Sequence, residues 1–253
     1  MKKPIPEGRV TSSREAYWKG LFNQFSQQQE EHAISGWSPQ GLRLRMQAYV
    51  CALPSLNLAP GSLVLDLGCG PGSYTRMLGA GGFRVVGVDF AWMVAAGARK
   101  RASVNGVDYV AGDATSLPFG EGVFDHVVCI GLFQSLERYE QALAEIKRVL
   151  KPGGVLCLMT LNRRFVKCRL DRLRGREEML MVDGSARPRL STYDPHQFAQ
   201  TLRQTGFAVT SLRPVQVYPE KLNRLEPLIR VWNRLPVLKF ETARSFMVIA
   251  TKG

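Results

Sequence analysis

The sequence lacks the features of a disulfide-bonded, secreted or membrane-spanning protein. Its 253 residues include only five cysteines, none in Cys-x-x-Cys spacing, which predicts reduced thiols and neither a disulfide framework nor a metal site. The longest near-continuous apolar run, about Val127 to Phe133, is far short of the ~20 residues that cross a bilayer. The first residues, MKKPIPEGRVTSSRE, contain no apolar stretch typical of a secretory signal. We therefore predict a cytoplasmic protein.

Acidic residues are scarce in the last third of the chain. The whole sequence has 34 Lys and Arg against 21 Asp and Glu, for a net charge of +13. Residues 1–60 contribute +3, residues 61–160 contribute 0 and residues 161–253 contribute +10. Because a charged surface attracts partners of the opposite sign, we expect the neutral middle and the basic final third to meet different partners.

Alternating apolar strands and helical stretches predict an α/β protein with a Rossmann-like, doubly wound sheet and helices on both faces. The first strands are expected near 62–68, 83–89, 107–113, 124–131 and 153–161. Their near-continuous apolar character, with helices between them, is typical of a parallel sheet that is buried on both sides. Two further strands are expected near 207–218 and 245–251, after a helix that begins near Asp194.

We expect two parts along the chain. Residues 1–60 are predicted to form an N-terminal helical cap, and residues 61–253 the main domain. Within the main domain, residues 161–195 would form a basic insertion or lid after the fifth strand, and residues 219–243 an amphipathic connection. The helical segments of the cap are expected near 14–34 and 40–53.

The most informative segment is VLDLGCGPGSYT, which begins at Val64. It predicts a strand that ends near Asp66, a glycine loop and a helix. Glycines allow a tight turn and a close approach of the backbone to a ligand, and the start of the helix offers N–H groups to an anion. A dinucleotide fingerprint would place its third glycine at Ser73, whereas this chain has Gly72. The spacing favours a smaller anion than a pyrophosphate, and a closely packed strand–turn–helix joint is the alternative.

Two further carboxylates are expected at the ends of neighbouring strands. Asp89 ends one strand, where a carboxylate can accept hydrogen bonds from both hydroxyls of a ribose. Asp113 ends the next strand and is followed by Ala114. Each alone is compatible with a turn residue or a helix cap. Together they predict a ligand site, because ligands of open α/β sheets bind at the carboxyl ends of the strands.

The segments VLDLGCGPGSYT, VVGVDFAWM, GDATSLPF, FDHVVCIGLFQSL and IKRVLKPGGVLCLMTLN resemble class I S-adenosylmethionine-dependent methyltransferases. The resemblance is to the small-molecule branch, which includes quinone, lipid and metabolite methyltransferases, and it covers residues 61–161. It implies a mostly parallel sheet with an antiparallel last strand. It also implies that the protein is an enzyme that uses S-adenosyl-L-methionine and releases S-adenosyl-L-homocysteine.

The resemblance implies roles for four residues around the methionine part of the cofactor. Gly68 and Gly70 would let the backbone approach it. Asp66 and the Cys129 carbonyl would face its ammonium group. These roles agree with the glycine spacing, since this cofactor carries a carboxylate, an ammonium, a ribose and a flat base but no phosphate.

The nucleoside part of the cofactor would meet the remaining predicted residues. Asp89 would hold both ribose hydroxyls, while Phe90 and Met93 would pack beside the ribose and the adenine. Asp113 would accept a hydrogen bond from the adenine amino group, with the Ala114 N–H nearby. The sequence therefore predicts that one cofactor spans the ends of three successive strands.

No catalytic base is assigned from the sequence. A sulfonium methyl is already electrophilic, so direct transfer needs alignment and desolvation more than a fixed catalytic constellation. His126 lies within an expected strand and is interpreted as structural. His32, Tyr193 and His196 lie in segments that could cover the acceptor, but a surface or capping role is favoured for each.

The acceptor is predicted to be a small molecule. Enzymes of this class that methylate amino groups of DNA bases carry an Asn/Asp-Pro-Pro-aromatic run after the fourth strand, where this chain has Cys-Ile-Gly-Leu at 129–132. The Pro-Cys dipeptide of the cytosine-C5 enzymes does not occur. Other RNA methylation stays open. A nicotinamide oxidoreductase is disfavoured by the glycine spacing and by the lack of any Tyr-x-x-x-Lys pair.

Two basic amphipathic segments predict a peripheral contact. Residues 163–176 hold seven basic side chains and one acid, and residues 221–235 place apolar side chains at helical spacing among basic ones. Such segments suit an anionic membrane, here its inner face, or an amphiphilic acceptor, and a solvated face is the alternative. We expect residues 163–176 to be a mobile cover of the site.

Two other functions remain: an RNA-modifying methyltransferase that uses the basic C-terminal third, and a non-catalytic cofactor-binding regulatory subunit.

Overall fold

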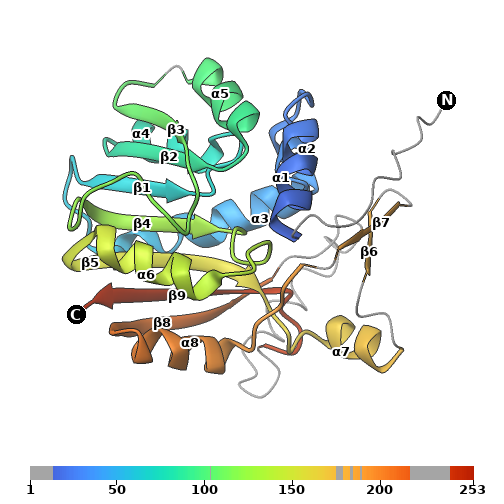
Figure 1. Ribbon diagram of the computed structural model, residues 1–253. Helices are drawn as coiled ribbons and strands as arrows, with labels where there is room; N and C mark the ends of the chain where they lie inside the picture. Colours follow the sequence, from blue (N-terminus) through green and yellow to red (C-terminus); the bar gives the residue numbers. More distant parts are fainter. Residues whose placement is uncertain (1–13, 103, 175–178, 183–184, 189, 217–239) are drawn as a thin grey trace.

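A seven-stranded sheet forms the centre of the protein, in the order β3-β2-β1-β4-β5-β9-β8 (Figure 1). The computed structural model describes residues 14–102, 104–174, 179–182, 185–188, 190–216 and 240–253. The strands of this sheet are β1 Leu63–Leu67, β2 Arg84–Asp89, β3 Val107–Ala111, β4 Phe124–Ile130, β5 Leu150–Leu161, β8 Phe207–Val215 and β9 Ser245–Lys252. From β3 to β5 every neighbouring pair is parallel, whereas β9 runs antiparallel to both β5 and β8. The predicted α/β sheet with an antiparallel last strand is confirmed.

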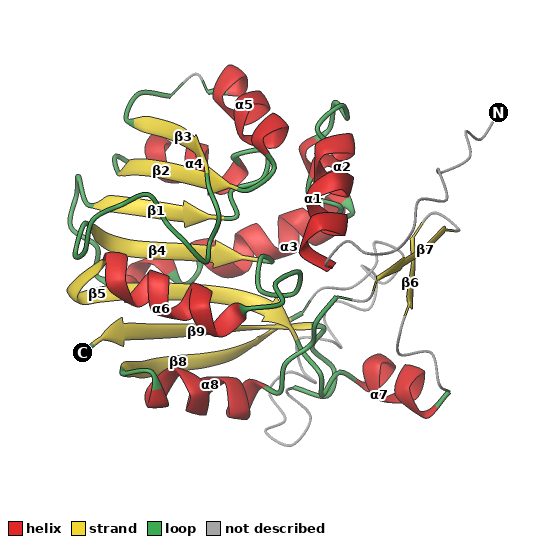
Figure 2. Cartoon of the chain, viewed as in Figure 1, coloured by secondary structure: helices red, strands yellow, loops and turns green. Residues whose placement is uncertain are grey.

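Helices cover both faces of this sheet (Figure 2). They are α3 Pro39–Val50, α4 Ser73–Ala80, α5 Trp92–Arg101, α6 Tyr139–Val149 and α8 Pro195–Gln204. Leu65 and Leu158 belong to the apolar layer that includes α6 and α8, while Val64 and Cys157 belong to the layer that includes α3 and α4. Because successive strand residues point to opposite faces, a continuous apolar strand is needed to build both layers.

Capping residues explain where two helices begin. The Asp194 Oδ1 atom accepts hydrogen bonds from the backbone N–H groups of His196 and Gln197, at 3.0 and 3.2 Å, and Pro195 opens α8. Ser38 accepts from the Gly41 N–H at 3.1 Å ahead of α3. These side chains satisfy N–H groups that have no partner within their own helix.

The N-terminal helices are shorter than the sequence indicated. One helix was expected over 14–34, but the structure has α1 Arg14–Phe25 and α2 Glu31–Ile34. The polar run Ser-Gln-Gln-Gln-Glu at 26–30 separates them, and it offers no apolar side chain to stabilise a continuous helix. The second expected helix ends at Val50 and is followed by a 3₁₀ helix, η1 Leu53–Leu56.

The basic insertion follows β5. It contains α7 Val166–Leu173 and an antiparallel hairpin, β6 Met179–Val182 and β7 Ser185–Pro188. The hairpin differs from the sequence-based prediction, which placed only a basic insertion here. The predicted amphipathic segment 221–235 lies outside the described residues. Within the described parts of the chain, no helix combines the length and apolar character that crossing a bilayer requires.

The carboxyl ends of β1 and β4 point toward α1, α2 and α3 (Figure 1). Loops that leave these strand ends therefore meet the N-terminal helices. This edge of the sheet is where the predicted ligand residues were expected.

Candidate functional site

The loop between β1 and α4 brings backbone to the carboxyl edge. Gly68, Gly70 and Gly72 have positive φ angles of 76°, 52° and 84°, a conformation that favours glycine. A Cβ atom at Gly68 would lie 2.9 Å from the Leu132 Cβ atom, whereas one at Gly70 would find its nearest neighbour, Ser35 Oγ, at 3.8 Å. The loop thus packs against protein at Gly68 and leaves open space at Gly70.

Asp89 ends β2 beside this loop and is only 8% exposed. Its Oδ2 atom accepts a hydrogen bond from the Gly70 N–H at 3.0 Å, and its Oδ1 atom accepts one from the Ala91 N–H at 2.9 Å. Burial raises the pKa of Asp89 to about 6, although both N–H groups favour the ionised form. Each carboxylate oxygen has a further lone pair, so Asp89 can accept two more hydrogen bonds from a ligand.

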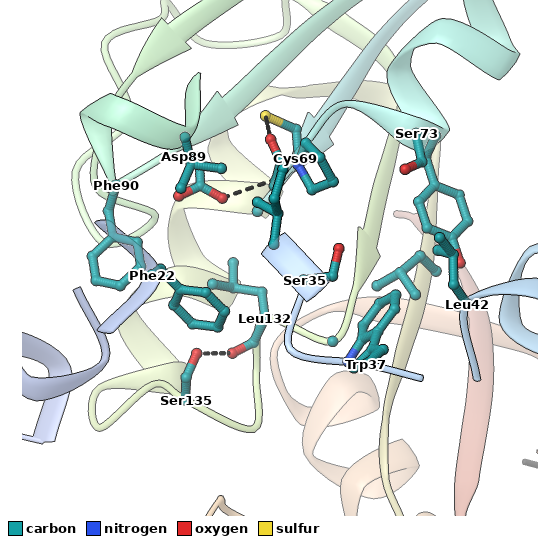
Figure 3. Close-up of a pocket in the computed structure, with 18 of the residues that line it drawn as sticks. Phe22, Ser35, Trp37, Leu42, Cys69, Ser73, Asp89, Phe90, Leu132 and Ser135 are labelled. Carbon is teal, nitrogen blue, oxygen red and sulfur yellow. Dashed lines mark hydrogen bonds between the residues drawn. The ribbon is translucent and has the colours of Figure 1, made fainter. Parts of the chain in front are cut away.

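Two adjoining cavities lie at this edge. The residues that line both are Gly68, Asp89, Phe90, Leu132 and Ser135. The first cavity, about 660 Å³ including space open to solvent, extends toward the N-terminal helices, and the second, about 420 Å³, extends toward the loop after β3. In the first cavity, Asp89 and Phe90 lie on one side, and Trp37 and Leu42 lie on the other (Figure 3).

The N-terminal helices build the outer wall of the first cavity. Its lining from this part of the chain is Phe22, Ile34, Ser35, Trp37 and Leu42. Trp37 lies against the end of β4, since a Cβ atom at Gly131 would come 2.6 Å from the Trp37 Cζ2 atom. Glu31 of α2 contacts Ser73 Oγ and the Arg76 guanidinium of α4. The wall is therefore tied to the helix that follows the glycine loop.

Most predicted cofactor residues reach these cavities. Gly68, Gly70, Asp89 and Phe90 line the first cavity, and Asp113 and Ala114 line the second. Asp66, Met93 and Cys129 line neither of the two, and Cys129 is fully buried. The roles that the resemblance implied for all nine residues remain predictions.

Two other buried titratable groups have protein partners. Asp66 accepts a hydrogen bond from Thr75 Oγ1 at 2.6 Å, and burial raises the pKa of Asp66 to about 7. His126 donates from Nδ1 to the Val155 carbonyl at 2.8 Å and accepts from the Tyr49 hydroxyl at 2.9 Å. Burial lowers the pKa of His126 to about 4, so it is neutral at physiological pH. These contacts support a structural role for His126.

The sequence did not indicate four further residues that line the first cavity, which are Phe22, Trp37, Leu42 and Tyr74. Their apolar or aromatic character predicts burial but does not indicate which partner buries them. For Trp37 the informative contact is with Gly131, on a distant part of the chain. A signal for this contact is present only in the three-dimensional structure.

Residues 65–158 match the family model described as a methyltransferase domain. The chain is 41% identical over 122 residues to a demethylmenaquinone methyltransferase of Thermus thermophilus, a match that covers 47% of this chain and 54% of that protein. The chain spans about half the length of the curated relatives it matches.

Two solved structures are similar to most of the chain. One is a Haloferax volcanii methyltransferase in complex with the Trm112 methyltransferase activator, with a TM-score of 0.67 at 18% identity over 91% of this chain and 96% of that chain. The other is a SAM-dependent methyltransferase of Methanosarcina mazei, with a TM-score of 0.63 at 19% identity over 79% of this chain and 96% of that chain. At these identities the similarity shows a shared fold.

Proposed function

We propose, on the premise that residues 65–158 form a class I S-adenosylmethionine-dependent methyltransferase domain, that the protein transfers a methyl group to a small apolar acceptor. The similarity of residues 65–158 to a methyltransferase domain supports the family and the cofactor that the sequence predicts. The acceptor and the activity of the whole protein are our proposal.

The observation that carries this proposal is the extension of the first cavity beyond the predicted cofactor residues. Opposite Asp89 and Phe90, its lining continues with Trp37 and Leu42. An apolar compartment next to a cofactor suits a small molecule, because apolar surface is removed from water when the acceptor enters.

The residues at the shared edge fit S-adenosylmethionine. Gly70 leaves space that a Cβ atom would occupy, and both Asp89 oxygens keep a lone pair for a ribose hydroxyl. Phe90 supplies an aromatic side chain beside them, and Asp113 and Ala114 line the adjoining cavity that would receive the adenine. When bound, the cofactor supplies an electrophilic methyl group.

The chain's own residues then have to align the acceptor and exclude water. Trp37 closes the compartment against Gly131, and Glu31 holds α2 against α4 through Ser73 and Arg76. These contacts keep the apolar wall in place next to the glycine loop. We propose that this closure, rather than a dedicated catalytic base, is the chain's main contribution to transfer.

A quinone-type acceptor is favoured within this class. The curated relatives include demethylmenaquinone methyltransferases, and their similarity falls on about half of each protein. An aromatic ring with an apolar tail would suit the apolar lining of the first cavity. The alternatives are an RNA acceptor and a non-catalytic regulatory subunit.

Methyl-labelled S-adenosylmethionine, incubated with the protein and a cell extract, tests these alternatives. We expect label in the organic phase. Label in RNA would establish the RNA-modifying alternative. No labelled product, with calorimetric binding of S-adenosylhomocysteine intact, would favour the regulatory subunit.

We further propose that the basic insertion contacts the inner face of an anionic membrane. Helix α7 projects from the body of the protein (Figure 1), and Val166, Leu170 and Leu173 are 50%, 43% and 83% exposed. They lie on one helical face, and Lys167 and Arg169 are exposed nearby. Exposed apolar and basic side chains on one helix suit a lipid surface. A cytoplasmic, peripheral location remains a prediction.

A further inference from the structure

We propose that the first cavity contains a subsite for an acidic oxygen of the acceptor, formed by the Tyr74 hydroxyl as hydrogen-bond donor and the Arg45 guanidinium as a nearby positive charge. The ligand class is a small apolar molecule that bears a phenolate, enolate or carboxylate oxygen. As a statement about the acceptor, this inference rests on the proposed function, but binding measurements alone can test the subsite.

Arg45 is a buried cation with no acidic partner among the described residues. It lies on α3 and is 5% exposed, and its Nη1 atom donates to the Gly41 carbonyl at 3.0 Å. Its guanidinium carbon lies 4.5 Å from the centroid of the Trp37 ring, which lines the cavity. Burial, together with the positive charge of Arg244, lowers the pKa of Arg45 to about 10, so the side chain stays charged at neutral pH. A buried charge without a counter-ion is costly, and an anionic ligand would offset that cost.

Tyr74 supplies the second, independent observation. It lines the first cavity and is 5% exposed, and its hydroxyl has no hydrogen-bond partner in the described parts of the chain. Burial raises the pKa of Tyr74, so the hydroxyl keeps its proton and can donate it to an acceptor oxygen. Buried polar groups normally have partners, and a ligand oxygen would provide one here.

Arg45 and Tyr74 are linked through their neighbours. Arg45 and Tyr49 lie one turn apart on α3, and the Tyr49 ring centroid lies 5.7 Å from that of Tyr74. Burial raises the pKa of Tyr74 more than the Arg45 charge lowers it. Arg45 does not line the cavity, whereas Trp37, whose ring its guanidinium faces, and Tyr74 do. Tyr74 would therefore contact the ligand, and Arg45 would be a positioning residue behind it. A nearby cation favours the ionised form of a phenol or enol, and the ionised oxygen is the better nucleophile.

The test compares two ligands of nearly equal shape, 2-naphthoate and its neutral methyl ester, by calorimetry in saturating S-adenosylhomocysteine. We expect the parent protein to bind the anion at least tenfold more tightly than the ester. Tyr74→Phe and Arg45→Met should each reduce this ratio toward one, and Arg45→Lys, which keeps the charge, should restore part of it.

Arg43→Met is the matched control. Arg43 lies on the same helix, is exposed, and donates to the Gln40 side chain rather than contacting Trp37, so its replacement should leave the ratio unchanged. Equal binding of naphthoate and ester by the parent, or an unchanged ratio in Tyr74→Phe, would overturn the subsite. If the parent failed to bind S-adenosylhomocysteine, the proposed function would fail instead. Because the readout is a ratio, a variant that folds only partly still reports it.

Discussion

Replacing Asp89 with alanine should weaken both cofactor binding and folding, and the two effects can be measured in separate assays. The variant loses the two hydrogen bonds that the carboxylate would accept from a ribose. Hydrogen bonds to a charged group contribute ~1.5–3 kcal/mol each before water partly compensates for their loss. S-adenosylhomocysteine should therefore bind more weakly by roughly 2–4 kcal/mol. This is about a 30- to 1,000-fold loss of affinity. Isothermal titration calorimetry measures it directly.

The structure adds a second consequence of the same change. The Gly70 and Ala91 N–H groups donate to Asp89 at 3.0 and 2.9 Å, and alanine removes the acceptor of both. A buried donor without a partner costs about 1–3 kcal/mol, so the free energy of unfolding should fall as well. Urea unfolding of the free variant measures this loss independently of the cofactor.

Asp108→Ala provides the control for Asp89→Ala. Asp108 is an exposed carboxylate on the neighbouring strand β3, so its removal changes the net charge equally without touching either cavity. We expect parent-like affinity and stability. If Asp89→Ala remained folded and bound S-adenosylhomocysteine as tightly as the parent, the assignment of ribose recognition to Asp89 would be refuted.

Four further results are expected. Because burial raises the pKa of Asp89 to about 6, affinity for S-adenosylhomocysteine should fall as the pH drops through 6, and a flat calorimetric profile from pH 8 to 5 would contradict this role. Burial raises the pKa of Asp66 to about 7, so the folded protein favours the protonated carboxyl. The stability that this preference contributes is fully present below pH ~4 and is lost as the pH rises through 7. Asp66→Asn should therefore flatten the dependence of the urea unfolding midpoint on pH. Gly131→Ala should displace the Trp37 ring and destabilise the fold by about 1–3 kcal/mol more than Gly122→Ala. Both glycines have positive φ, but only a Cβ atom at Gly131 meets a side chain. Equal urea midpoints and equal tryptophan fluorescence of the two variants would contradict the contact. Exchanging the exposed Leu173 of α7 for glutamate should reduce sedimentation with anionic liposomes and leave cofactor affinity unchanged, and undiminished sedimentation would mean that this face is only solvated.

Local patterns predict the glycine loop and the strand ends well, because their geometry is encoded within a few residues. Asp89 follows an apolar strand, and the loop from Gly68 needs positive φ angles that glycine adopts without strain. The hairpin of β6 and β7 was not predicted, because each of its strands is only four residues long and so short a run carries little periodicity.

The packing of the N-terminal segments against the sheet has no comparable local pattern. Trp37 lies against Gly131, and Tyr49 forms a hydrogen bond with His126, which lies in the centre of the sheet. Each of these contacts joins the N-terminal helices to β4 or to the residue that follows it. Apolar periodicity predicts that such side chains are buried, but the partner depends on how the helices pack against the sheet.

The position of β9 affects how the chain can fold during synthesis. Residues 245–252 lie between β5 and β8 and pair with both, so β8 has no place in the sheet until the last strand has left the ribosome. The parallel part of the sheet, β3 to β5, is complete once residue 161 has emerged. Until β9 arrives, β5 presents an unpaired edge, the kind of surface that promotes aggregation of partly folded chains. Expression yield should therefore be far more sensitive to changes that weaken β9 than to equally destabilising changes in α1.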